Sequence, residues 1–80
     1  MSVSFVVEEA GCESCAALVR EALEPLGAVG AVVIDEAADS ASVELGGDVT
    51  EADVNSALAA VSEGVGHAYR VQPGSWRPLG

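Results

Sequence analysis

The chemistry of this chain centres on its two cysteines, Cys12 and Cys15, which are three positions apart. An alternating apolar stretch precedes them and a helical pattern follows. Both thiols are therefore expected on a strand-to-helix loop and the first helical turn. Free backbone N–H groups and the positive end of the helix dipole favour a thiolate there. Such a pair can bind a soft metal ion or cycle between dithiol and disulfide, and the spacing alone leaves both chemistries open.

Composition excludes several kinds of partner. The chain has 80 residues, 13 acidic residues and only three arginines, with a net charge of -10. Nucleic acids and anionic membrane surfaces bind through Lys and Arg, so neither is expected as a partner. The acidity is explained by solubility alone or by a basic protein partner. The longest uncharged apolar run, residues 27–34, is far below the roughly 20 residues of a membrane span. No signal peptide is readable, and we expect a cytoplasmic protein.

The first half of the chain must position the cysteines. Residues 2–7 alternate, with Val3, Phe5 and Val7 on one side, which predicts a strand with one core face. From Cys15 onward the apolar residues recur at helical spacing. Pro25 and Gly27 are expected to end that helix.

The second half repeats the strand and helix pattern. Residues 28–34 form a continuous β-branched apolar run that predicts a buried strand, and residues 41–45 alternate as its hairpin partner. Thr50 with Asp53 three residues later predicts a capped second helix. Residues 67–71 are then expected to form a fourth strand.

The order β-α-β-β-α-β predicts an α+β, ferredoxin-like sandwich, with a four-stranded antiparallel sheet and both helices on one face. We expect residues 1–72 to form this domain, with Tyr69 and Val71 pointing inward. Residues 73–80 contain two prolines and are expected to form a loose tail. Trp76 within that tail either stays free, folds back onto the open face of the sheet, or docks a partner.

A Cys-x-x-Cys pair that opens a helix in a short βαββαβ chain resembles the heavy-metal-associated domain. That family includes soluble copper chaperones, periplasmic mercury-binding proteins and the N-terminal metal-binding domains of P-type metal-transporting ATPases. The resemblance covers residues 2–72 and implies a metal-binding protein that is not an enzyme. It also implies a protein partner such as a metal-transporting ATPase, which would dock through a basic surface.

The chain departs from the family motif Gly-Met-x-Cys-x-x-Cys at two positions. Glu9 stands where the glycine is expected, and Ala10 replaces the methionine that packs beneath the metal loop. The change to alanine implies thinner packing there but removes no ligand. Zinc-binding members carry an acid before the first cysteine, where this chain has Gly11, so the resemblance favours an ion other than zinc.

Family members often place a Tyr, Lys or His beside the metal loop, between the second helix and the fourth strand. By count, His67 falls at that place. His67 is then predicted as a third ligand or as a group that tunes the charge of the thiolates. The alternative is a histidine that faces solvent.

Thiolates select Cu(I) and also bind Zn(II), Cd(II) and Hg(II). Two thiolates alone suit the low coordination number of Cu(I) or Hg(II), whereas structural zinc takes four protein ligands. The sequence therefore predicts a metallochaperone or metal-binding domain, with Cu(I) held by Cys12 and Cys15 and with His67 as an accessory. Two alternatives stay open: a redox-active dithiol protein, and a degenerate domain that acts only in protein interaction.

Overall fold

The predicted order of strands and helices is confirmed in the computed structural model, which describes residues 2–79. Two helices are interleaved with the strands, and one short strand follows the predicted set. The elements are β1 (Ser2–Glu8), α1 (Glu13–Leu23), β2 (Ala28–Asp35), β3 (Ser40–Gly46), α2 (Glu51–Ser62), β4 (Arg70–Val71) and β5 (Arg77–Pro78).

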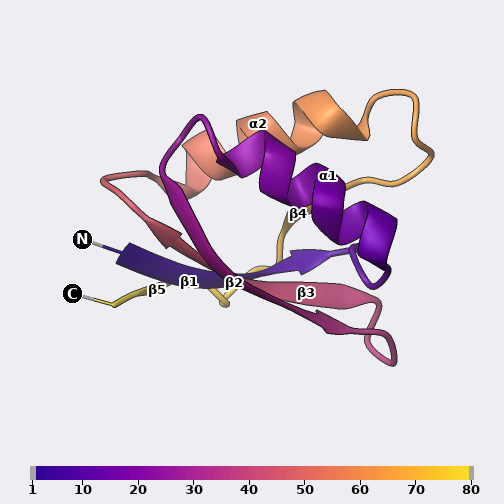
Figure 1. Ribbon diagram of the computed structural model, residues 1–80, viewed down its shortest axis with the longest axis horizontal. Helices are drawn as coiled ribbons and strands as arrows, with labels where there is room; N and C mark the ends of the chain where they lie inside the picture. Colours follow the sequence, from indigo (N-terminus) through magenta and orange to yellow (C-terminus); the bar gives the residue numbers. More distant parts are fainter. Residues whose placement is uncertain (1, 80) are drawn as a thin grey trace.

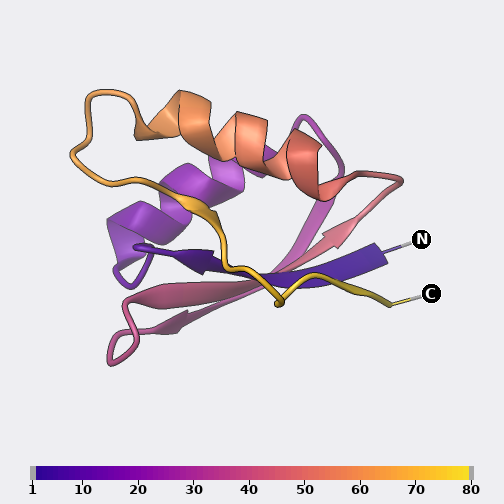
Figure 2. The same cartoon turned by 180° about the vertical axis from the view of Figure 1, so that it is seen from behind.

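The strands form one antiparallel sheet in the order β2-β3-β1-β4, with β5 also paired to β1. Both helices cover the same face of the sheet, and the opposite face carries no helix (Figures 1 and 2). This arrangement is the predicted α+β ferredoxin-like sandwich.

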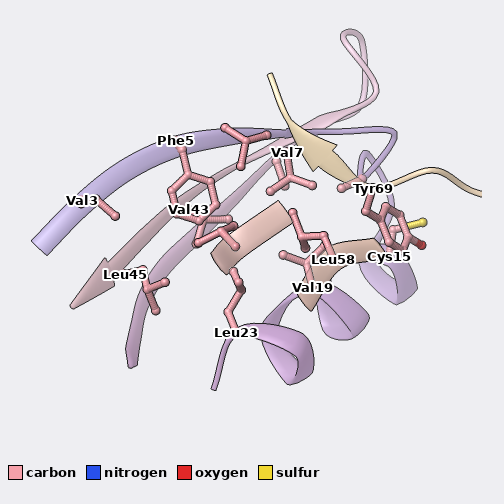
Figure 3. Close-up of a cluster of buried hydrophobic side chains, with 14 residues drawn as sticks. Val3, Phe5, Val7, Cys15, Val19, Leu23, Val43, Leu45, Leu58 and Tyr69 are labelled. Carbon is pink, nitrogen blue, oxygen red and sulfur yellow. The ribbon is translucent and has the colours of Figure 1, made fainter. Parts of the chain in front are cut away.

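A single apolar core lies between the helices and the sheet. Every second residue of β1 and β3 points into it, because side chains alternate across a strand. The helices contribute side chains at helical spacing, and one end of the core reaches Cys15 and Tyr69 (Figure 3). The largest fully buried side chains are Phe5, Leu23, Leu45, Leu58, Val7, Val19, Val43 and Val54.

The cap predicted for the second helix is confirmed. The Thr50 hydroxyl accepts a hydrogen bond from the Asp53 amide, and the Asp53 carboxylate accepts one from the Thr50 amide. Two backbone N–H groups at the start of α2 are thereby satisfied. The first helix begins differently, with a cysteine at its cap.

The prediction that residues 28–34 form a buried strand is wrong. β2 lies at the edge of the sheet, where none of its residues is fully buried and Val33 is 61% exposed. A continuous apolar run is typical of a strand covered on both faces, but β2 is uncovered on one face and along one edge. The outer edge is partly capped, since the Arg20 guanidinium donates to the Gly30 carbonyl.

The predicted fourth strand is shorter than expected. The described part of the predicted tail, residues 73–79, returns to the sheet and is not loose. Only Arg70–Val71 pair as β4; the chain then turns, and Arg77–Pro78 return to β1 as β5. Within the turn, the Ser75 hydroxyl accepts a hydrogen bond from the Val6 amide and donates one to the Gln72 carbonyl. Because a side chain takes over a backbone position in the ladder, the pattern of residues 67–71 could not reveal this interrupted strand.

Three loops lie at the end of the molecule opposite residues 2 and 79 (Figure 1). They are the loop between β1 and α1, the turn between β2 and β3, and the loop between α2 and β4. Cys12 lies on the first of these loops, and Cys15 lies in the first turn of α1, which follows it. Within residues 2–79, neither helix has the length and apolar character needed to cross a membrane.

Candidate metal centre

Cys12 is the N-cap of α1. Its backbone is extended, with φ -132° and ψ 161°, and its carbonyl accepts the first helical hydrogen bond from Ala16. Its Sγ accepts a hydrogen bond from the Cys15 amide at 3.3 Å. The sulfur thus occupies the position that a Ser or Asp oxygen usually holds, where negative charge is favoured by the helix end.

Cys15 lies one turn into the helix and points into the core. It is only 4% exposed, whereas Cys12 is exposed to solvent. The two Sγ atoms are 2.6 Å apart, so the two sulfurs face each other and can react as a pair; an ion bound between them would require the exposed Cys12 side chain to turn outward. The pair therefore has one sulfur that an incoming molecule can reach and one that it cannot.

The two thiols have different surroundings, which shift their pKa values in opposite directions. The hydrogen bonds that Cys12 shares with the Cys15 side chain and with the Ser14 hydroxyl lower the pKa of Cys12, and the Cys15 amide, which donates to its sulfur, adds to this effect. Burial raises the pKa of Cys15, and the interaction with Cys12 raises it further. Cys12 is thus the better nucleophile and the first sulfur to ionise.

Tyr69 closes the buried side of the pair. Its ring is 3% exposed and lies beside Cys15 at the end of the core (Figure 3). Burial and the neighbouring Cys15 raise the pKa of the phenol, so Tyr69 stays protonated and can act only as a donor toward a thiolate. Within residues 2–79 the Tyr69 hydroxyl has no partner in hydrogen-bonding geometry while Cys15 is a thiol, but it lies close enough to favour the Cys15 thiolate, which lowers the pKa of Cys15 against the larger effect of burial.

His67 lies outside this pair of sulfurs. Its ring stacks on Tyr69 with the centroids 5.7 Å apart, and its Nδ1 is 3.9 Å from the Glu9 carboxylate. Within residues 2–79, no three His, Cys, Asp or Glu side chains converge as a ready metal site. The role of His67 as a third ligand stays a prediction.

The loop that carries the cysteines rests on the turn between β2 and β3. The Gly11 amide donates to Asp39 Oδ1 at 3.1 Å, and a Cβ added at Gly11 would lie 2.5 Å from the Asp39 Cα. No side chain fits at position 11 without a backbone shift. Ala10, at the position of the family methionine, is fully buried in the core.

Sequence reasoning placed the cysteines correctly on the loop and first turn, but it missed two neighbours. Counting along the loop pointed to His67, whereas Tyr69 is the residue that lies against Cys15. The one signal in the sequence for the position of Tyr69 was the prediction that its side chain points inward. Asp39 lies 28 positions from Gly11, and no local pattern indicates their contact.

Solved structures confirm the fold. One, from work on crosstalk between Cu(I) and Zn(II) homeostasis, is 22% identical, covers 90% of this chain and 99% of its own, and has a TM-score of 0.56. The oxidized MerP of Ralstonia metallidurans CH34 is 16% identical over the same shares of the two chains, with a TM-score of 0.59. A comparison with curated proteins gives no match.

The sequence pattern of the heavy-metal-associated domain matches residues 4–67, which include both cysteines and His67. This match spans most of the chain, and the fold and the position of the Cys-x-x-Cys pair agree with it. The chain therefore belongs to the heavy-metal-associated domain family.

Proposed function

We propose that this protein binds one Cu(I) ion between the thiolates of Cys12 and Cys15 and passes it to another protein. The observation that carries this proposal is the convergence of two sulfur atoms at the start of α1, one exposed and one buried beneath Tyr69. Binding would release the thiol protons, since the thiolate is the ligand.

The donor set favours an ion of low coordination number. Two sulfurs converge here, and the contact with Asp39 leaves no room for an acidic side chain at Gly11. Cu(I) and Hg(II) accept two thiolates, whereas Zn(II) would need water, a nearby carboxylate or a second molecule to complete four ligands. Zn(II) is thus expected to compete poorly with Cu(I), whereas Cd(II) and Hg(II), which are soft ions, could occupy the site when the protein is exposed to them.

The exposed sulfur supports transfer as well as binding. A thiolate of the recipient could approach the ion from the Cys12 side and form a three-coordinate intermediate before the bond between the ion and Cys15 breaks. Ligands are exchanged without the ion ever being free in solution. The exposed Cys12 would be the first sulfur exchanged for a ligand of the recipient, and the buried Cys15 would retain the ion until then.

The recipient is proposed to be a protein with a basic docking surface, such as a metal-transporting ATPase. The net charge of -10 would attract such a surface, and the attraction would weaken with salt. We place the protein in the cytoplasm, where thiols stay reduced and free to bind metal. In this proposal the protein is a carrier and catalyses no reaction.

Single substitutions test the ligand assignment. Cys12→Ser or Cys15→Ser should abolish tight Cu(I) binding while the circular dichroism spectrum stays that of the folded protein. Ala17→Ser introduces the same side chain at an exposed position of the same helix, serves as the matched control and should retain binding. Tight Cu(I) binding by either cysteine variant would contradict the proposal.

The difference in acidity between the thiols also supports a second function. An exposed thiol of lowered pKa beside a buried thiol of raised pKa is the arrangement of a dithiol that exchanges disulfides. That function requires a Cys12–Cys15 reduction potential above about -270 mV and turnover of a disulfide substrate. Equilibration with glutathione buffers measures the potential and separates the two functions.

A further inference from the structure

Glu9 is the first residue of the loop between β1 and α1 (residues 9–12, the cysteine loop), and it has a backbone conformation that its residue type disfavours. Its φ is 62°, in the left-handed region where glycine has no steric penalty and other residues do. Its carboxylate nevertheless has a defined place: Oε1 accepts a hydrogen bond from the Ala68 amide at 3.3 Å and lies 3.9 Å from His67 Nδ1. Glu9 thereby joins the cysteine loop to the segment that carries Tyr69.

Asp39 repeats this combination on the other side of the loop. Its φ is 49°, and its Oδ1 accepts the hydrogen bond from the Gly11 amide. Glu9 and Asp39 are the non-glycine residues with positive φ in the described part of the chain. Each is strained, and each directs a carboxylate across a boundary of the cysteine loop.

We propose that Glu9 and Asp39 form a two-sided clamp that holds the cysteine loop ready for metal before the metal arrives. Glu9 fixes the loop to the segment 67–69, and Asp39 fixes it to the turn between β2 and β3. Both are positioning residues that act through the backbone around Cys12 and Cys15. The proposal rests on the proposed metal-binding function and adds the device that prepares the site.

The physical reason is the entropy of the loop. Fixing the backbone of a flexible residue costs conformational entropy, and a loop that is already ordered does not bear this cost on binding. Ala10 beneath the loop is fully buried but has a short side chain, so its packing gives the loop little support. The hydrogen bonds of Glu9 with Ala68 and of Asp39 with Gly11 hold the loop in place from its two sides, in place of packing beneath it.

Glycine substitutions test the clamp, because glycine removes the carboxylate and also relieves the strained backbone. In Glu9→Gly and Asp39→Gly, the loss of a hydrogen bond and the relief of strain have opposite signs and similar sizes. The thermal midpoint should therefore change little. Cu(I) affinity, measured by competition with a chelator, should fall roughly tenfold in each variant.

Conservative variants provide the rescue. Glu9→Gln and Asp39→Asn keep the accepting oxygen and should bind Cu(I) as the wild-type protein does. Glu36→Gln removes the same charge from the turn that holds Asp39, and it should also leave the affinity unchanged. Equal losses in the amide variants or in Glu36→Gln would show a charge effect and overturn the clamp. Unchanged Cu(I) affinity in both glycine variants would also overturn the clamp. A loss of affinity that occurs only because the variants unfold would do the same.

A measurement without metal keeps this proposal separate from the proposed function. Amide hydrogen exchange at Ala68 should accelerate in Glu9→Gly, and exchange at Gly11 should accelerate in Asp39→Gly, with neither effect in the amide variants. If wild-type protein fails to bind Cu(I), the proposed function fails, and this exchange pattern still decides whether the clamp exists. Unchanged exchange in both glycine variants would overturn it.

Discussion

At the scale of single residues, the two cysteines are chemically unequal although they belong to one motif. Cys12 caps a helix in solvent, and Cys15 is buried against Tyr69. The same helix start favours a thiolate on Cys12, while the core disfavours one on Cys15. A carrier needs one sulfur that a recipient can attack and one that retains the ion, and this inequality provides both.

The inequality predicts an order of alkylation. As pH rises, Cys12 should react with iodoacetamide first, with a midpoint below that of an ordinary thiol, because its pKa is lowered. Cys15 should follow only at higher pH, since burial raises its pKa. Peptide mass spectrometry across a pH series would measure both midpoints. Equal midpoints, or earlier reaction of Cys15, would contradict the description of the site.

Tyr69→Phe is predicted to separate stability from thiol chemistry. The buried hydroxyl has no partner in hydrogen-bonding geometry, and such a group costs roughly 1–3 kcal/mol. Its removal should raise the free energy of unfolding of the metal-free protein by about 1 kcal/mol. The Cys15 midpoint should move to still higher pH, because the hydroxyl now helps to lower that pKa. Urea unfolding and alkylation measure the two effects; reduced stability with an unmoved midpoint would argue against this role.

At the scale of elements, the periodic parts of the fold were predictable and the exceptions have physical causes. Alternation in β1 and β3, helical spacing after Cys15 and the Thr50 cap each reflect local backbone geometry, so the sequence carries them. The edge position of β2 depends on strand order, which is not a local property. The interrupted last strand depends on the Ser75 hydroxyl, whose partner Val6 lies 69 positions away.

The C-terminal segment is predicted to stabilise the fold. Trp76 stacks on Phe5 with the ring centroids 5.2 Å apart and is packed against the core. Trp76→Ala should lower the free energy of unfolding by about 2 kcal/mol, the scale of one buried large side chain. Leu79→Ala is the matched control, because that side chain is 52% exposed and should change stability by less than about 0.5 kcal/mol. If urea unfolding gives equal losses of stability for Trp76→Ala and Leu79→Ala, the C-terminal segment does not stabilise the fold.

At the scale of the whole molecule, the cysteine loop is separated from the two ends of the described chain. The cysteine loop and its two supporting loops lie at one end, and residues 2 and 79 approach the other (Figures 1 and 2). The sequence pointed to Cys12 and Cys15 as the centre of the proposed site, since the motif is local. It did not reveal Tyr69 or Asp39 as neighbours, because the fold brings them there from 54 and 24 positions beyond Cys15.

The central claim is that this arrangement binds Cu(I) in preference to Zn(II). The most direct test is an anaerobic titration of the reduced protein with Cu(I) against a competing chelator, with Zn(II) titrated in parallel. We predict a one-to-one Cu(I) complex that withstands the chelator, together with weak binding of Zn(II). Loss of Cu(I) to the chelator, or tighter binding of Zn(II), would contradict the account.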